Sequence, residues 1–225
     1  MAAYRYYKFN CTAGNNASAF MVNEIELFET VEPVYGGDVT TSGMTVTDNQ
    51  NYGAGYEGSK AFNDSYLTGA TYRWQKNGQT YPIWVKIDLG SGNAKEILSY
   101  MIMADDGVYP PKDWTLQGSN NDADWTTVST VTSQTGWQSG ERRSFKVDYG
   151  FTLSGTVKDY SSSGLVRSVR VIRKSDGGLV GTTTSASGTG IWSIDVPTAG
   201  PYQVIEFKSD TDDEEAQIYD AVTAI

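Results

Sequence analysis

The sequence contains no histidine. That absence excludes His-dependent catalytic triads, His-ligated zinc and the commonest general base near neutral pH. The single cysteine, Cys11, cannot form an internal disulfide, and it alternates with Tyr7 and Phe9 in a strand-like pattern. We therefore expect Cys11 to be a small buried residue rather than a reactive thiol.

Long apolar runs and positive charge are also scarce. No apolar run approaches the ~20 residues that cross a bilayer, and residues 1–10 lack the basic start and apolar stretch of a secretory signal. We expect no membrane insertion and synthesis without Sec export. The chain has 17 Lys and Arg against 27 Asp and Glu, a formal net charge of -10. Nucleic acid is not an expected partner, because its binders need a basic surface.

The chain of 225 residues has room for one large or two modest domains. Residues 83–90, IWVKIDLG, alternate apolar and polar side chains, which predicts a strand with one face in a core. Residues 109–125, YPPKDWTLQGSNNDADW, begin with two prolines, continue as a short strand from Trp114 to Gln117 and break into a Gly-, Asn- and Asp-rich turn. This pattern predicts a loop, a strand, a tight turn and a further strand.

Four ordered motifs in this part of the chain form a pattern: AFND at 61–64, Trp74, WVKIDLG at 84–90 and PKDWTLQGSNN at 111–121. The set resembles the discoidin domain, the galactose-binding-like domain also found as the C-type domain of coagulation factors and in many carbohydrate-binding modules. The resemblance implies an all-β fold, a galactose-binding-like jelly-roll β-sandwich, over residues 1–149.

The strand order departs from that family. Residues 4–11 and 23–28 alternate as two strands joined by a hairpin or short loop, and such a pair normally closes the domain rather than opening it. Residues 140–147 resemble the strand that normally leads into the pair. We interpret residues 1–30 as the last two strands of a circularly permuted sandwich, with about 37–148 as the rest. A rival interpretation, the remnant of a preceding domain copy, leaves an exposed sheet edge.

Three segments are predicted to lack regular structure. Residues 30–43, TVEPVYGGDVTTSG, form a Pro- and Gly-containing linker, here called the 30–43 linker. Residues 48–60 and 68–81 are predicted to be long surface loops, and long loops are disproportionately functional.

Residues 150–225 contain six short runs separated by turn residues, which predicts a small Greek-key sandwich. The pattern resembles Ig-like or prealbumin-like modules of the carboxypeptidase regulatory type. Variants of these modules are frequent in bacteriophage virion proteins. The second domain is therefore expected to be an Ig-like β-sandwich.

Aromatic residues divide by their setting. Those in or beside predicted strands are expected to pack, because large aromatics dominate core burial; these are Trp84, Trp114 and Trp125. Those in predicted loops are as well placed to contact a ligand or partner as to pack; these are Tyr52, Tyr56, Tyr109 and Trp137. Sugar binders of the family usually add a His and an Arg to the aromatic platform. Because this chain has no His, Arg73 is the candidate cation.

The resemblance also implies a structural Ca²⁺ between the AFND loop and the first Glu of the closing strand. Ca²⁺ prefers hard oxygen ligands. The matching positions are Glu24, the backbone at Lys60, Asn63, Asp64 and Thr71. Asn63 stands where the family usually has Asp.

Paired carboxylates could suggest a glycosidase. The pairs Asp105/Asp106 and Asp122/Asp124 lie in turn-like segments where Asp bonds its own backbone, so we expect solvated turns. The acidic run at 210–215 is also interpreted as a solvated turn.

The sequence and these resemblances therefore predict a non-enzymatic bacteriophage virion protein, on the tail or on the particle surface, whose carbohydrate-binding-like module attaches to host-surface glycans. It is expected to belong to an assembly of virion subunits that includes further copies of the chain. An alternative is a structural capsid-decoration or tail-assembly protein whose loops contact other subunits. A third is an accessory sugar-binding fragment of a glycoside-processing enzyme.

Overall fold

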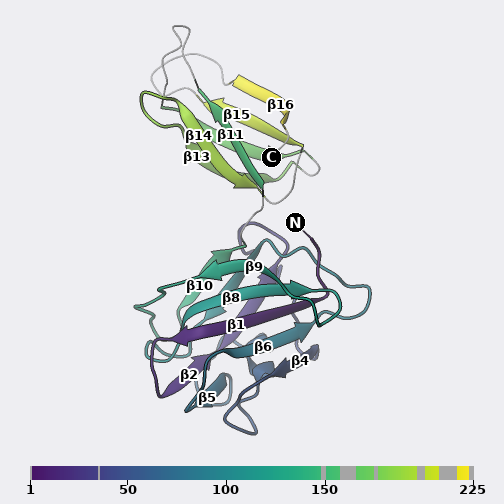
Figure 1. Cartoon of the computed structure of the whole chain (residues 1–225), viewed down its shortest axis with the longest axis vertical. Coiled ribbons are helices and arrows are strands. Elements are labelled where there is room, and N and C mark those ends of the chain that lie inside the picture. Colours follow the sequence, from purple (N-terminus) through teal and green to yellow (C-terminus); the bar gives the residue numbers. More distant parts are fainter. Residues whose placement is uncertain are drawn as a thin grey trace. The chain divides into compact units, whose positions relative to one another are not determined.

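The computed structural model describes residues 2–34, 36–147, 151–157, 166–174, 177–196, 201–207 and 217–222. The chain divides into two compact units, Ala2–Asp148 and a second that starts at Tyr149 (Figure 1). The predicted acidic turn at 210–215 lies outside the described residues. Among the described residues, no helix has the length and apolar character needed to span a membrane.

A five-stranded antiparallel sheet forms one layer of the first unit, in the order β4-β6-β1-β8-β9 (Figure 1). Its strands are β4 Thr45–Asp48, β6 Ile83–Asp88, β1 Tyr6–Gly14, β8 Pro111–Ser119 and β9 Thr126–Val131. β1 lies at the centre, paired with β6 on one side and β8 on the other. The N-terminal segment is thus an internal part of this sheet.

The second layer is a three-stranded sheet in the order β10-β7-β3. It consists of β10 Arg142–Lys146, β7 Ser99–Met103 and β3 Glu24–Phe28. β3 and β7 are buried along their whole length, so both faces of these strands are covered. A two-stranded sheet of β2 Ala19–Val22 and β5 Trp74–Asn77 and the 3-10 helix η1 Gly58–Phe62 complete the unit.

The core lies between the two layers and is built from alternate residues of each strand. Tyr7, Phe9 and Cys11 of β1 are buried, as the alternation predicted. The Trp114 indole nitrogen donates to the Tyr100 hydroxyl at 2.9 Å, so a buried aromatic finds a polar partner across the layers. Trp114 therefore packs in the core, as its strand position predicted.

Two local predictions were wrong. Residues 4–11 and 23–28 do not form a hairpin, because β1 and β3 belong to different sheets and β2 lies between them in sequence. The predicted loop at 68–81 contains β5, which pairs with β2. Its four residues are too short a run to show period-two alternation, so the sequence pattern did not reveal this strand.

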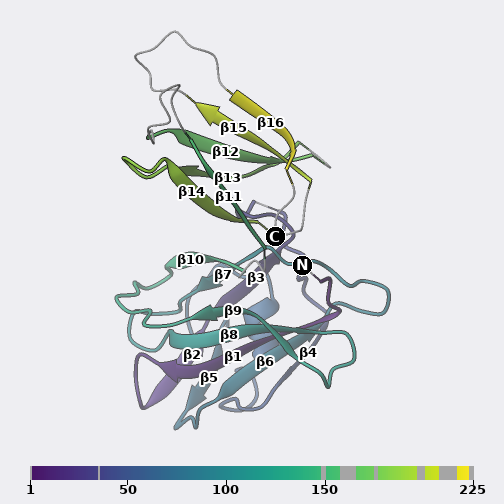
Figure 2. The ribbon, with the colours of Figure 1, turned by 45° about the horizontal axis from the view of Figure 1, so that its top comes forward.

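The described residues of the second unit form six strands, at the six runs identified in the sequence (Figure 2). They are β11 Phe151–Thr156, β12 Ser168–Arg173, β13 Leu179–Thr184, β14 Ile191–Val196, β15 Tyr202–Phe207 and β16 Gln217–Val222. β11 pairs with β14, and the remaining four form a sheet in the order β13-β12-β15-β16. Trp192, Val171 and Tyr202 belong to its own buried core, so this unit is a second all-β body. Its Ig-like character stays a prediction.

Candidate functional site

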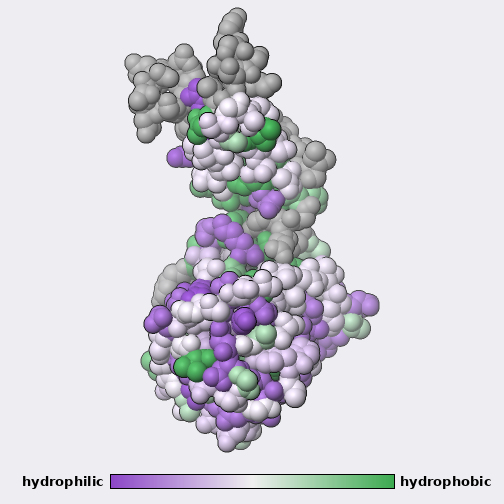
Figure 3. Space-filling model, turned by 60° about the vertical axis from the view of Figure 1, so that its left-hand side comes forward, coloured by the Kyte–Doolittle hydropathy of each residue, from purple (hydrophilic) through white to green (hydrophobic). Residues whose placement is uncertain are grey.

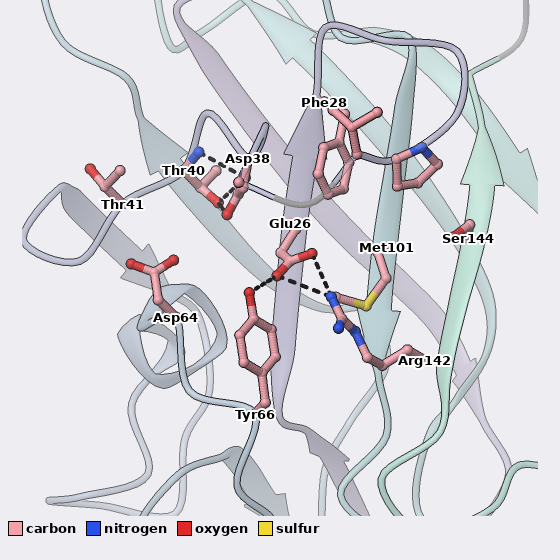
Figure 4. Close-up of a pocket in the computed structure, with 13 residues that line it drawn as sticks. Glu26, Phe28, Asp38, Thr40, Thr41, Asp64, Tyr66, Met101, Arg142 and Ser144 are labelled. Carbon is pink, nitrogen blue, oxygen red and sulfur yellow. Dashed lines mark hydrogen bonds and ion pairs between the residues drawn. The ribbon is translucent and has the colours of Figure 1, made fainter.

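A pocket of about 630 Å³ lies on the face of the β10-β7-β3 sheet that points away from the five-stranded sheet (Figure 4). Side chains from β3, β7 and β10 form its floor, and the 30–43 linker and the segment after η1 form its walls. The lining residues are Glu26, Phe28, Pro33, Val34, Gly36, Asp38, Thr40, Thr41, Asp64, Tyr66, Met101, Arg142 and Ser144.

The polar centre of the pocket is the buried carboxylate of Glu26. The Tyr66 hydroxyl donates to Glu26 Oε1 at 2.5 Å, and Arg142 Nη2 lies 3.1 Å from Glu26 Oε2. Figure 4 shows both side chains converging on this carboxylate. The hydrogen bond to Glu26 raises the pKa of Tyr66 to about 12, and the Arg142 guanidinium lies 4.5 Å from the centre of the Tyr66 ring. The three side chains thus form one connected group.

Asp38 lies on the opposite wall. Its Oδ1 accepts hydrogen bonds from the backbone nitrogens of Leu27 and Thr40, both at 2.9 Å. Burial raises the pKa of Asp38 to about 6. Because the Leu27 bond ties the linker to β3, Asp38 holds this wall of the pocket in place.

The floor and rim of the pocket also carry apolar groups. Phe28 and Met101 are buried side chains of β3 and β7, and they belong to one small apolar cluster. Val34 of the linker remains 48% exposed. The pocket therefore combines an apolar surface with hydrogen-bonding groups of both kinds, because Arg142 donates and the carboxylates accept.

Only some of the residues proposed as Ca²⁺ ligands lie close together. Glu24 is fully buried; its Oε2 accepts bonds from the backbone nitrogens of Asn63, at 3.4 Å, and Ser65, at 3.2 Å. Its Oε1 is buried and has no hydrogen-bond partner among the described residues. Burial raises the pKa of Glu24 to about 9. A buried carboxylate with an orphaned oxygen fits a cation ligand.

The other proposed ligands vary in position. Lys60 lies in η1 and Asn63 directly follows it. The Asp64 side chain instead accepts from the Ser42 nitrogen at 3.3 Å and lines the pocket, and Thr71 is exposed in the next loop. Among the described residues, no cluster of three or more His, Cys, Asp or Glu side chains could hold a metal. Any Ca²⁺ here would therefore depend on backbone and amide oxygens beside Glu24.

Sequence reasoning missed Asn23, whose Oδ1 is also buried and lacks a partner within the described part of the chain. Its amide nitrogen donates to the Leu67 carbonyl. Asn23 and Glu24 thus both contact the segment 63–67. The only sequence feature that could have indicated Asn23 is its position next to Glu24 at the start of a predicted strand.

The loop residues proposed for ligand contact gather at one end of the sandwich, where β1, β4, β7 and β9 end. Tyr52 is 56% exposed and meets Tyr56 edge to face, with ring centres 5.5 Å apart. The Tyr52 nitrogen donates to the Gln75 carbonyl, and Arg73 Nε donates to Gln75 Oε1, both at 2.8 Å. Tyr52, Tyr56 and Arg73 therefore surround the same strand, β5.

Other residues at this end are less available. Trp137 is only 3% exposed and lies under the Arg143 guanidinium, 4.2 Å from the ring centre, so it offers no free face for a sugar. Tyr109 is half-buried, and its carbonyl accepts from the Met21 nitrogen. Asp105 was expected to be solvated; it is 4% exposed because it forms an ion pair with Arg73. Arg73, the cation proposed from the sequence for sugar binding, is therefore already paired with Asp105.

The surface in view in Figure 3 is mainly hydrophilic on the first unit, and apolar residues form small separate patches there. Such a surface suits polar partners more than a broad apolar interface.

Residues 58–150 match the family model described as F5/F8 type C, NedA-like, galactose-binding domain. A search of curated proteins found no match. The matched range includes all four motifs that carried the resemblance, from 61–64 to 111–121. The first unit is thus an all-β sandwich, and residues 58–150 within it are similar to a galactose-binding-like domain.

Proposed function

We propose that the first unit is a non-enzymatic glycan-binding module and that its sugar site is the pocket around Glu26, Tyr66 and Arg142. The observation that supports this site is the pocket itself, which combines a fixed carboxylate and guanidinium with an apolar surface. Sugar hydroxyls act as donors and acceptors together, so they suit such a mixed set. Val34, which is 48% exposed at the rim, is the apolar side chain that can pack against the face of a sugar ring, while Phe28 and Met101 support the floor from below.

The test is a glycan array with the purified full chain, followed by calorimetric titration of each hit. Tyr66→Phe removes one hydroxyl and Arg142→Gln removes the donor fork, and each is expected to weaken binding about tenfold or more. Tyr52→Phe at the loop end is the matched control and should bind as the parent does. Melting curves verify that each variant is folded.

The loop end is the second candidate site, because Tyr52 is exposed beside Tyr56 and Arg73. If Tyr52→Ala abolishes binding while Tyr66→Phe leaves it unchanged, the sugar site belongs to this end. If no glycan on the array binds, the module has a structural role instead.

We also propose a bound Ca²⁺ next to Glu24. The orphaned Oε1 of this buried carboxylate supports it. Glu24 would hold the ion together with oxygens of the segment 60–67, and the ion would fix that segment against β3. The role of the ion would be structural. By fixing this segment it would also hold Asp64 and Tyr66, which line the proposed sugar pocket.

The sandwich is proposed to be a circular permutant. Two observations support this: the family match begins at residue 58 and ends at 150, and the strands that precede it belong to both sheets, β1 at the centre of one and β3 at an edge of the other. The 30–43 linker, which lines the pocket, is then the connection that the permutation created.

The proposed setting is the surface of a bacteriophage particle, where several copies attach to host-surface glycans. The resemblance of the second unit to modules of virion proteins supports this setting. Weak single contacts would then suffice through avidity. A decoration or assembly protein that contacts other virion subunits is the competing proposal, and an accessory fragment of a glycoside-processing enzyme is the third.

A further inference from the structure

The outer face of the five-stranded sheet carries an ordered array of side chains that the pocket does not use. Strand register places Trp84, Asn10 and Thr115 in one row across β6, β1 and β8. The next row contains Lys86, Lys8 and Gln117. Figure 1 shows these three strands side by side at the centre of the sheet. We call these rows, together with Trp125, the sheet face.

Positive charge gathers on the sheet face, although the chain carries a net charge of -10. Lys8 and Lys86 occupy neighbouring strands in the same row. Lys86 forms an ion pair with Asp122 at 2.7 Å. The Lys8 ammonium instead lies 4.1 Å from the centre of the Trp125 ring. Burial and the nearby Lys86 lower the pKa of Lys8, against a smaller opposite effect of Asp122, so a further anion beside this ammonium would favour its charged form.

Other charged groups on this side of the sheet pair with each other. Asp88 accepts from Arg5, which directly precedes β1, at 2.6 Å, and Arg5 also stacks on Tyr6. Because Asp88 and Asp122 already have cationic partners, Lys8 is the ammonium best placed to receive an external anion.

Two indoles accompany the two lysines. Trp84 on β6 and Trp125 next to β9 are both half-buried, so part of each remains accessible. The Trp125 ring reaches the Lys8 ammonium on β1, and the Lys86 ammonium lies 6.0 Å from the centre of the Trp84 ring. Each lysine of the row thus has an indole beside it, and two separate indoles suit a ligand of more than one sugar ring. Asn10 and Gln117 between the indoles offer amide groups for hydroxyls.

We propose that the sheet face binds an acidic oligosaccharide, with a ring carboxylate at Lys8 and sugar rings against Trp84 and Trp125. This site lies on the other sheet from the pocket around Glu26, so the two sites are independent. A few cations between aromatic faces suit a carboxylated sugar, whereas nucleic acid needs a more extended basic surface.

To test this, the full chain is titrated with tetragalacturonate and with its fully methyl-esterified form. Binding is followed by tryptophan fluorescence and by calorimetry, each at low and at high salt. The acid form should change the fluorescence and bind more weakly at high salt, and the neutral ester should bind at least about tenfold more weakly. The same titrations are repeated with a trimer of sialic acid and its methyl ester. Sialic acid is a different acidic sugar that carries the same carboxylate group.

Lys8→Gln and Trp125→Leu should each reduce the affinity for the acid form about tenfold or more. Lys95→Gln removes the same charge from the Glu29 ion pair and should have no effect. Tyr66→Phe should also leave this binding intact, which separates the sheet face from the pocket. Equal binding of acid and ester, an unaffected Lys8→Gln variant, or no binding of either acidic sugar would overturn the proposal.

Discussion

At the scale of single residues, the buried acidic groups show how burial and function are linked. Glu24 and Glu26 are buried in β3, where apolar residues would otherwise be expected, and the half-buried Asp38 of the 30–43 linker lies beside this strand. Each costs free energy to bury unless partners compensate. Glu26 has Tyr66 and Arg142, while Glu24 retains an orphaned oxygen. This difference in partners is why we propose Glu26 as part of the sugar site and Glu24 as a ligand of Ca²⁺.

Substitution of Glu24 by Gln tests the metal role. Gln keeps an oxygen that can accept from the Asn63 and Ser65 nitrogens but carries no charge, so the variant is expected to melt no lower than the parent in EDTA. Added Ca²⁺ should raise the melting temperature of the parent by several degrees, and of the variant little or not at all. An equal rise of the melting temperature in parent and variant would show that Glu24 is not a ligand of the ion.

Asp38 makes stability depend on pH. Its pKa is about 6 in the folded chain, above the usual value of an Asp, so the folded state binds more protons than the unfolded state between about pH 4 and 6. The contribution of Asp38 is complete below its unfolded pKa and is lost as the pH rises through 6. Chemical denaturation in EDTA should show this fall in the free energy of unfolding.

Asp38→Asn is the matched variant, because its side-chain oxygen can still accept from Leu27 and Thr40. The fall between pH 4 and 6 should be smaller in this variant. Glu24 also lowers the free energy of unfolding as the pH rises, over a wider range up to about pH 9. The Asp38→Asn substitution should leave this contribution of Glu24 unaffected. Identical pH profiles of parent and variant would contradict the role of Asp38.

At the scale of elements, the position of β1 dominates the first unit. β1 lies between β6 and β8, so the centre of the sheet cannot form until this early segment meets strands more than 70 residues later in the chain. β3 likewise pairs with β7, about 75 residues later in the chain. Such pairings between distant segments are tolerant of chain order as long as the ends lie close together.

A rearranged chain tests the permutation. It begins at residue 37, runs to 148 and continues through a short Gly-Ser segment into residues 2–30. β10 ends at Lys146 beside Ser99, on the side of the sandwich where β1 begins, so the new connection is short. We expect a cooperative unfolding transition within several degrees of the parent unit, measured by circular dichroism. A chain without a cooperative transition would contradict the proposal.

At the scale of the whole molecule, each unit has its own core. The core of the second unit gathers residues such as Leu153, Val169 and Trp192, and that of the first gathers residues such as Phe9 and Trp114. Separate cores allow separate unfolding. Calorimetry of the full chain should therefore resolve two transitions. Ca²⁺ should move only the transition of the first unit, and a single transition that shifts as a whole would contradict this expectation.

Much of the fold followed from the sequence alone. Period-two alternation identified β1 and β6, because one face of each strand must meet a core. Short runs separated by turn residues identified the strands of the second unit. The same alternation placed Trp84 on the face opposite Ile83 and Val85. These features depend on neighbouring residues, so local pattern determines them.

Tertiary structure alone decided the site. The group of Glu26, Tyr66 and Arg142 joins residues 40 and 116 positions apart, and no local pattern indicates that they meet. The burial of Trp137 under Arg143 and the ion pair between Arg73 and Asp105 were likewise invisible in the sequence. Alternation reports which face of a strand a side chain occupies, but packing between distant segments determines its partners and its accessibility to a ligand.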